Sequence, residues 1–442
     1  MISFPVPIIR RFLLLILLPC MVIPLMSEET GTPWDPFNGE HVAGEFGGAR
    51  TSLNESDGIS LTGESTDDLL GEVTGGRHSG STLSGLLALV GSADLQKAAG
   101  WGGGSFKTTW LWFYGSNLSQ HFVGNGMTVS SIAGNPAFLC NELWLQQSLF
   151  KGALSLKAGL LCIGNEFMTC DSASSLVNST FTAPVLFTFN AGGAVPATTL
   201  QTPGFRVEIR PGEGWALRSV FAQVDPLSGQ SLLRGPGGWV DSGGGYLSLC
   251  ELDRDWKGGN GGLAGTFRTG LWFEKQKASN LHPIEGEGGF PGFARQSPGW
   301  NSGYYGLVDQ TLFRGVSRED LPLGEVPRIS VFSLSGFSPQ NASPVSLYTQ
   351  AGVLASGCIP NRRSDKLSLG FAWARLGQDA IGTAARNSWP GAGYESVLEG
   401  TWVVQITPAF TVQPDLQYVI HPGATERYGN SLVIGLRAVL EL

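Results

Sequence analysis

Apolar and polar side chains alternate along most of this chain with a period of two residues. In the segment 204–210, for example, Phe205, Val207 and Ile209 lie on one face and charged residues lie on the other. The final segment keeps the same alternation up to Leu442. Because successive side chains of a β-strand point to opposite faces, the pattern predicts strands with one apolar and one polar face.

Segments of this kind recur about sixteen times, and most are about ten residues long, the length of a tilted strand that crosses a bilayer. Beyond the N-terminus, no run of apolar residues reaches the length of a transmembrane helix. The predicted strands lie near 59–67, 83–95, 105–114, 141–149, 153–162, 204–210, 215–224, 245–252, 263–274, 303–313, 328–337, 345–355, 366–375, 394–406, 411–420 and 430–442.

The connections between these segments alternate in length. Short polar turns, such as 150–152 and 210–214, are followed by long connections rich in Gly, Pro and Asn. Short turns at one rim and long loops at the other are typical of outer-membrane barrels. We therefore predict an all-β fold, a transmembrane antiparallel β-barrel of the porin type with about 16 strands, over residues 57–442. Its last strand must pair with its first, because an open sheet edge in lipid leaves N–H and C=O groups unsatisfied.

A soluble β-sandwich shows the same alternation, so a binding or adhesion protein on such a scaffold is the alternative class. A sandwich buries its apolar faces in a dry core, and this many strands would usually be divided by linkers into several domains. The sequence shows no linker after residue 57. This continuity favours the membrane barrel.

The N-terminus has a different pattern. Two arginines precede an apolar run from Phe12 to about Met26, which is too short and too rich in Pro for a membrane span. Such a run is typical of a secretory signal. We predict a signal peptide at 1–26, followed by a periplasmic segment at 27–56.

Composition narrows the function further. The formal net charge is −8 and Lys and Arg do not cluster, which argues against nucleic-acid binding. No motif for a nucleophile, a zinc protease or a phosphate-binding loop is present, so we expect neither an enzyme nor a cofactor. The cysteines beyond the signal are either partly paired, with a thiol left for a neighbouring chain, or buried as small apolar residues. Their spacing fits no metal site; they are Cys140, Cys162, Cys170, Cys250 and Cys358.

Charged residues on the polar faces are the functional candidates, because in a barrel they point into the lumen. Opposed acids and bases across a narrow pore select small polar solutes. Trp144 shares a face with Glu142, and it can either stack on a sugar ring or a guanidinium group or pack against the wall. The nine charged candidates are Glu142, Lys157, Arg206, Glu208, Arg268, Glu395, Glu399, Asp415 and Arg437.

Several segments form a recognisable set, among them "EFGGARTSLNESDGISLTGE" (45–64), "NELWLQQSLFKGALSLKAGLL" (141–161) and "YESVLEGTWVVQITPAFTVQPDLQYVIHPG" (394–423). These segments resemble the OprB family of carbohydrate-selective porins. The resemblance implies a sixteen-stranded porin in the bacterial outer membrane, with a periplasmic N-terminal segment and a pore narrowed by an inward loop. It also places Glu142, Arg206, Glu208 and Asp415 near the constriction, because these residues fall in the matching segments.

Two features depart from the usual pattern of this family. The chain ends in Leu442 rather than in an aromatic residue, and it is unusually rich in cysteine. The cysteines make it look like the AaxA-like arginine porins, a branch of the family from bacteria whose envelopes are cross-linked by disulfides. That branch implies passive uptake of L-arginine, whereas the broader family implies a monosaccharide. The resemblance further implies contact with outer-membrane lipid, intermolecular disulfides and the trimer that is typical of sixteen-stranded porins.

Overall fold

The computed structural model describes residues 49–191, 201–224, 245–258, 262–276, 299–315, 326–378, 380–382, 390–391 and 393–442. The predicted signal peptide at 1–26 lies outside the described residues, as does the predicted periplasmic segment as far as residue 48. The end of that segment forms the short helix α2, Ala49–Ser56. It leads directly into the first strand.

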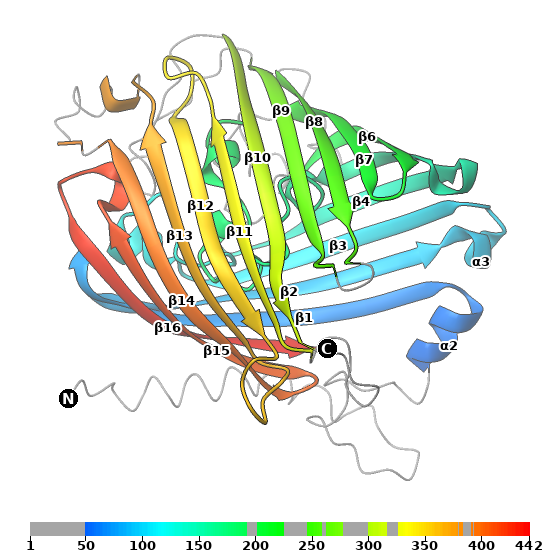
Figure 1. The fold of residues 1–442 in the computed structure, drawn as a ribbon, viewed down its shortest axis with the longest axis horizontal. Coiled ribbons are helices and arrows are strands. Elements are labelled where there is room, and N and C mark those ends of the chain that lie inside the picture. Colours follow the sequence, from blue (N-terminus) through cyan, green and yellow to red (C-terminus); the bar gives the residue numbers. More distant parts are fainter. Residues whose placement is uncertain are drawn as a thin grey trace.

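The sixteen strands form one closed antiparallel barrel, in which each strand pairs with its neighbours along the chain and β1 pairs with β16 (Figure 1). Their lengths range from 9 residues in β5 to 18 in β1. The strands are β1 Ile59–Gly76, β2 Gly80–Asp94, β3 Gly104–Gly115, β4 Ala137–Leu149, β5 Leu154–Cys162, β6 Gln201–Gly212, β7 Trp215–Val224, β8 Gly245–Trp256, β9 Gly265–Gln276, β10 Gly299–Arg314, β11 Arg328–Phe337, β12 Val345–Ser356, β13 Lys366–Leu376, β14 Tyr394–Thr407, β15 Phe410–Ile420 and β16 Gly429–Glu441.

The predicted number, order and direction of strands are confirmed. The largest difference is β1, which runs to Gly76 although the prediction stopped at residue 67. Polar residues at 64–68 interrupt the apolar alternation in the middle of this strand. One of them, Asp67, is buried where the Tyr114 hydroxyl donates a hydrogen bond to it over 2.6 Å. A residue of β3, two strands away in the ring, therefore satisfies this polar group in the middle of β1.

The outer face of the barrel is apolar. On β6, β9, β14, β15 and β16, the exposed residues Phe205, Phe273, Leu398, Leu416 and Ile434 all lie opposite the face that carries the charged candidates. This distribution suits a lipid environment and excludes the soluble sandwich, which would bury these side chains. Among the described residues, no helix is both long and apolar enough to cross a membrane.

The junction of β1 and β16 closes the ring. Asp68 lies opposite Arg437 in the register, and the two side chains form a buried bidentate ion pair with N···O distances of 2.7 and 2.8 Å. At the end of the chain, the Leu442 N–H donates to the Gly63 carbonyl over 2.8 Å. The alternation persists to the terminus because the last strand is a fully paired wall of the barrel.

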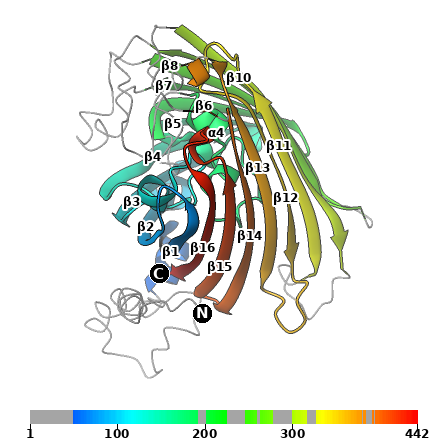
Figure 2. The same ribbon diagram turned by 90° about the vertical axis from the view of Figure 1, so that its left-hand side faces the viewer.

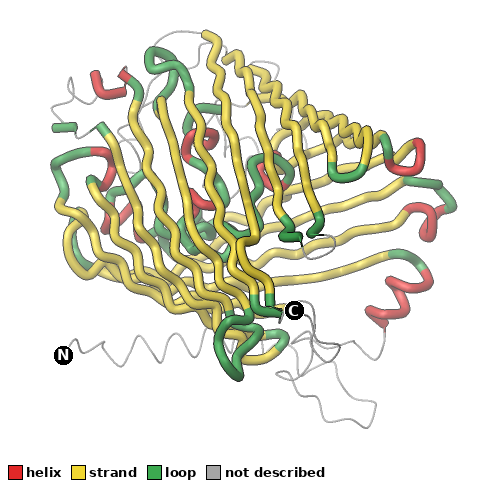
Figure 3. Tube along the Cα trace, in the orientation of Figure 1, coloured by secondary structure: helices red, strands yellow, loops and turns green. Residues whose placement is uncertain are grey.

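Two long connections fold into the barrel, as Figures 2 and 3 show. The first, 116–136, joins β3 to β4, and the second, described over 163–191, follows β5 and contains the helix α4, Val185–Thr188. The other short helix, α3, Leu95–Ala99, lies in the turn between β2 and β3.

The apolar core of the molecule lies inside the barrel. It consists of apolar residues of the inward loops packed against inward-facing wall residues such as Tyr305 and Tyr348, which are fully buried. Where the loops cover it, the inner wall therefore combines apolar residues with buried carboxylates, such as Glu395 and Glu399, that accept hydrogen bonds from the loops. This pattern differs from a uniformly polar lumen, and it leaves only part of the cross-section open to water.

Candidate pore constriction

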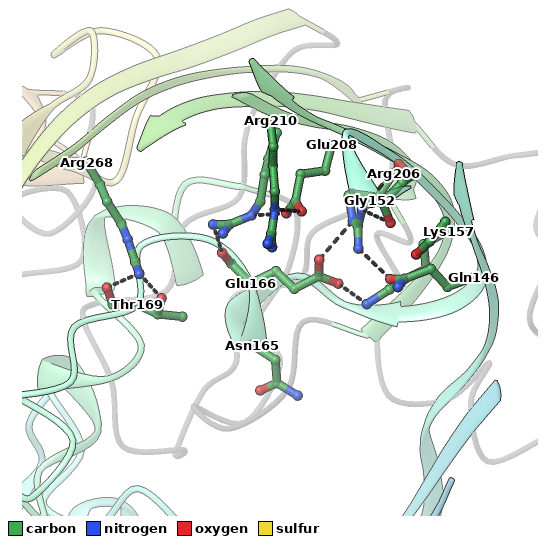
Figure 4. A pocket seen from close by; sticks show the side chains of 13 residues that line it. Gln146, Gly152, Lys157, Asn165, Glu166, Thr169, Arg206, Glu208, Arg210 and Arg268 are labelled. Carbon is green, nitrogen blue, oxygen red and sulfur yellow. Dashed lines mark hydrogen bonds and ion pairs between the residues drawn. The ribbon is translucent and has the colours of Figure 1, made fainter. Parts of the chain in front are cut away.

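A polar cavity of about 440 Å³ lies between the second inward loop and the wall formed by β4 to β9 (Figure 4). The loop contributes Asn165, Glu166 and Thr169. The wall contributes five bases, one acid and several neutral residues, which are Lys157, Arg206, Arg210, Arg218, Arg268, Glu208, Gln146, Ser148, Gly152 and Ser155.

Strand register brings the charged residues together. Lys157 on β5 lies directly opposite Arg206 on β6, and Glu208 on β6 lies directly opposite Arg218 on β7. Because side chains alternate along each strand, residues two apart on β6 and opposite residues on its neighbours share the lumen face. The charged wall is thus a direct consequence of the period-two pattern.

Both carboxylates in the cavity are held by two cations each. One oxygen of Glu166 accepts from Lys157 Nζ at 2.7 Å and the other accepts from Arg206 Nε at 2.9 Å. Glu208 accepts from Arg210 Nε at 2.7 Å and from Arg218 Nε at 2.6 Å. The ion pairs of Glu166 with Lys157 and Arg206 connect the inward loop to the wall at the edge of the cavity.

Two further acids lie behind the arginines. Asp253 is 2.5 Å from Arg218 Nη1 and 4.0 Å from Arg268 Nε, and Glu251 is 3.5 Å from Arg218 Nη1. Arg268 Nη1 also donates to the hydroxyl and the carbonyl of Thr169 on the loop. Counting these two acids with the lining residues gives five bases and four acids around the cavity.

Wall carboxylates also anchor the inward loop next to the cavity. Glu251 accepts the Met168 N–H at 2.9 Å and the Tyr305 hydroxyl at 2.5 Å. Asp309 accepts the N–H and the hydroxyl of Ser172 at 2.9 and 2.7 Å. Position 270 must be glycine, because a Cβ there would overlap the Tyr305 ring that crosses to Glu251. Backbone N–H groups folded into a barrel need acceptors, and the wall supplies them.

The predicted candidates divide into two groups. Four of them, Lys157, Arg206, Glu208 and Arg268, lie together at the cavity. Of the four residues that the family resemblance placed near the constriction, only Arg206 and Glu208 are in this set. Both occupy the lumen face that the alternation of β6 predicted for them.

Glu142 and Trp144 lie beside the cavity but do not line it. Glu142 is buried and accepts from Lys107 at 2.8 Å, from the Thr109 hydroxyl at 3.0 Å and from the Trp144 indole at 3.3 Å. Lys157 Nζ lies 3.9 Å from the centre of the Trp144 ring. The inward direction of Trp144 agrees with the prediction, but the cation that it stacks on belongs to the protein itself.

Glu395, Glu399 and Asp415 lie beneath the inward loops and are buried. Glu395 accepts the N–H groups of Gly126 and Met127, and Glu399 accepts those of Val177 and Asn178. Asp415 accepts from the Gln417 amide at 2.7 Å.

Like the ninth candidate, Arg437, which lies in the β1–β16 junction, these three acids face inward as the alternation predicted. However, they bond to protein groups instead of lining the water-filled cavity. A carboxylate on the lumen face can accept hydrogen bonds from a loop or from a solute, and the sequence does not distinguish these two roles.

Three charged lining residues, Glu166, Arg210 and Arg218, were absent from the predicted set. Glu166 lies in a long loop with no periodicity, and Arg210 was recognised on the polar face of β6 but was not selected. Arg218 lies on β7, whose phase is ambiguous because Val220 and Ala222 share its inward face. The inward-facing arginines on β6, followed by an arginine on the next strand, are the sequence signal that would have identified Arg218.

The five described cysteines are all free thiols. The structure therefore gives no support to pairing within the chain among these residues. Cys140, Cys162 and Cys170 are buried, as expected for small apolar residues, and Cys358 is exposed. Burial, together with the nearby carboxylate of Asp309, raises the pKa of the Cys170 thiol in the inward loop. Disulfides between chains, like the trimer, stay predictions.

Comparison with known proteins decides the family. The family model described as "Carbohydrate-selective porin, OprB family" matches residues 78–442. The chain belongs to the OprB family. It is 25% identical over 428 residues to Porin B of Pseudomonas aeruginosa, which covers 90% of this chain and 91% of that protein. Porin AaxA of Chlamydia pneumoniae is 30% identical over 101 residues, or 23% of this chain and 22% of that protein.

Solved structures of the family have the same fold. The high-pH structure of OprB from Pseudomonas putida superposes with a TM-score of 0.78 at 22% identity, covering 92% of this chain and 99% of that one. Membership in the OprB family, together with the closed sixteen-stranded barrel, places the protein in the bacterial outer membrane as a channel and not as an enzyme. The predicted fold class and family are confirmed.

Proposed function

We propose that this OprB-family porin is a passive channel for small carbohydrates, and that the cavity between the second inward loop and β4–β9 is its constriction. The observation that carries this proposal is the family match over residues 78–442. The cavity supports it, because charged and amide groups that converge on a space of about 440 Å³ can replace the water around a polyol during passage.

In this proposal Lys157, Arg206, Glu208 and Arg268 line the constriction, together with Glu166, Arg210 and Arg218. Glu395, Glu399 and Arg437 bond to the loops that narrow the lumen, whereas Glu142 and Asp415 bond to neighbouring wall residues. The channel does no chemistry, so the solute moves down its own gradient. The ion pairs between lining residues keep the lining rigid. The passing solute forms short-lived hydrogen bonds with the lining.

Uptake of L-arginine is less well supported. The local match to Porin AaxA covers less than a quarter of the chain, and the cavity lining contains five bases against two acids. A cationic solute would pass a wall of its own charge, which costs free energy. The prediction of arginine uptake therefore rests on the cysteine content and on this local match.

Proteoliposome swelling tests the proposal. Vesicles that contain the refolded barrel are diluted into isosmotic glucose, a disaccharide of glucose, or a neutral dipeptide of similar size to glucose. We expect glucose to enter fastest. Equal rates for glucose and the dipeptide would contradict carbohydrate selectivity and would leave a general diffusion pore. Empty vesicles serve as the control for leakage.

A further inference from the structure

The hydrogen-bonding groups that line the cavity are strongly unbalanced between donors and acceptors. Each oxygen of its two carboxylates, Glu166 and Glu208, already accepts a hydrogen bond from a Lys or Arg side chain, which occupies about half of their acceptor sites. The amide oxygen of Gln146 accepts from Arg206 Nη2 at 2.8 Å. The Ser155 hydroxyl accepts from Arg206 Nη1 at 2.9 Å. These acceptors are already engaged by protein groups.

Donors, in contrast, remain free. Among the described residues, Arg210 bonds only through Nε, so that its Nη1 and Nη2 have no protein partner, and its side chain is 59% exposed. Arg218 bonds through Nε and Nη1, which leaves Nη2. Arg268 donates through Nη1 to Thr169, and its Nη2 is likewise without a partner. Three guanidinium groups thus present free N–H donors around one cavity.

The charge balance points the same way. The lining residues carry five positive and two negative charges, a balance of +3. Adding Glu251 and Asp253, which lie behind Arg218, reduces the balance to +1. A neutral sugar offers hydroxyls that both donate and accept, so it uses free donors and free acceptors about equally. A carboxylate offers acceptor oxygens alone and binds guanidinium groups in charge-assisted hydrogen bonds.

We infer that the constriction favours acidic sugars, such as uronic acids, over neutral sugars, and neutral sugars over amino sugars. The geometry assigns Arg210 and Arg268 as the residues that determine this order, because each has free guanidinium N–H groups at the cavity, whereas Arg218 lies against the three acids Glu208, Glu251 and Asp253. This inference rests on the proposed function, since it names the class of carbohydrate that the same constriction prefers.

Three solutes of nearly equal size and ring shape test the inference. Tracer influx of glucuronate, glucose and glucosamine is measured in proteoliposomes at low salt, with K⁺ and a K⁺ ionophore holding the membrane potential at zero. We expect glucuronate to enter about fivefold faster than glucose, the ratio that one unit of charge gives at contact distance in water. Glucosamine should enter more slowly than glucose by a similar factor.

The variants Arg210→Gln and Arg268→Gln remove one charge each from the lining. Each should lower the ratio of glucuronate to glucose influx, and the double variant should bring it close to one. The matched control is Arg254→Gln, because Arg254 lies on the opposite face of β8 from Asp253, at the same end of the barrel, and does not line the cavity. It should leave the ratio unchanged.

A measurement on the unaltered protein keeps the test independent of how the variants fold. Raising the salt to about 1 M shortens the Debye length to about 3 Å, so the preference for glucuronate should largely disappear. Equal influx of the three sugars at low salt, or fastest influx of glucosamine, would overturn the inference while leaving the carbohydrate channel intact. If none of the three sugars enters vesicles that conduct KCl, the proposed function fails as well.

Discussion

The inward loop 116–136 should depend on one buried carboxylate, that of Glu395. This side chain is fully buried at the start of β14 and accepts three backbone N–H groups, from Gly126 at 2.9 Å, from Met127 at 2.6 Å and from Gly423 at 2.5 Å. The variant Glu395→Leu removes the acceptor and leaves all three donors without a partner. It therefore tests whether wall carboxylates hold the loops inside the barrel.

The size of the effect follows from the number of donors. A buried donor without a partner costs about 1–3 kcal/mol, so three of them cost about 3–9 kcal/mol if they stay buried. Water from the lumen can reach an opened loop, and we therefore expect the lower end, about 3 kcal/mol. This corresponds to an increase of about a hundredfold in the population with the loop open. Glu395→Gln keeps one carbonyl acceptor and should show a smaller increase.

Hydrogen exchange measured by mass spectrometry on the refolded barrel in detergent gives the readout. Peptides that cover 116–136 should exchange about a hundredfold faster in Glu395→Leu, whereas peptides from the strands should be unchanged. The control is Glu426→Gln, a change at an exposed carboxylate in the neighbouring β15–β16 loop. A variant whose gel mobility still changes on boiling still forms the folded barrel. If hydrogen exchange in 116–136 is unchanged in such a Glu395→Leu variant, the anchoring role of Glu395 is refuted.

Two further predictions concern the barrel itself. In the β1–β16 junction, Arg437→Leu leaves the carboxylate of Asp68 buried without its ion-pair partner, so the free energy of unfolding in urea should fall by about 3–5 kcal/mol. Adding Asp68→Asn to this variant should recover part of the loss. If the double variant recovers nothing, the assigned ion pair is contradicted. In the turn between β12 and β13, burial opposes ionisation of Asp365. Its hydrogen bonds from Arg362, Gln405 and Trp402 outweigh this effect and hold its pKa below the ordinary value. Because a lowered pKa stabilises the folded state only while the carboxyl is ionised, this contribution should be present at neutral pH and lost as the pH falls below about 4. Unfolding curves of the parent and Asp365→Asn should therefore converge in acid, and a constant difference would disprove the assignment.

The sequence by itself determined the wall of this protein. A period of two fixes which residues face lipid and which face the lumen, and closure follows because no strand edge can stay open in a bilayer. For this reason Arg206 and Glu208 could be placed on the inner face of β6 from the sequence. The pattern was less informative where polar residues interrupt it, as around Asp67 in the middle of β1, which a tyrosine two strands away satisfies. It was also ambiguous on β7, where Val220 and Ala222 share the inward face with Arg218.

Only the tertiary structure decided what each inward charge does. The loops have no periodicity, so the sequence does not show where their backbone N–H groups will lie or which carboxylates will accept them. Glu399 and Glu208 look alike in the sequence, since each alternates with apolar neighbours on a strand. In the structure a loop covers Glu399 and bonds to it, while Glu208 stays at the cavity between two arginines. The path of the loops, which depends on contacts between distant strands, separates the anchors from the pore lining.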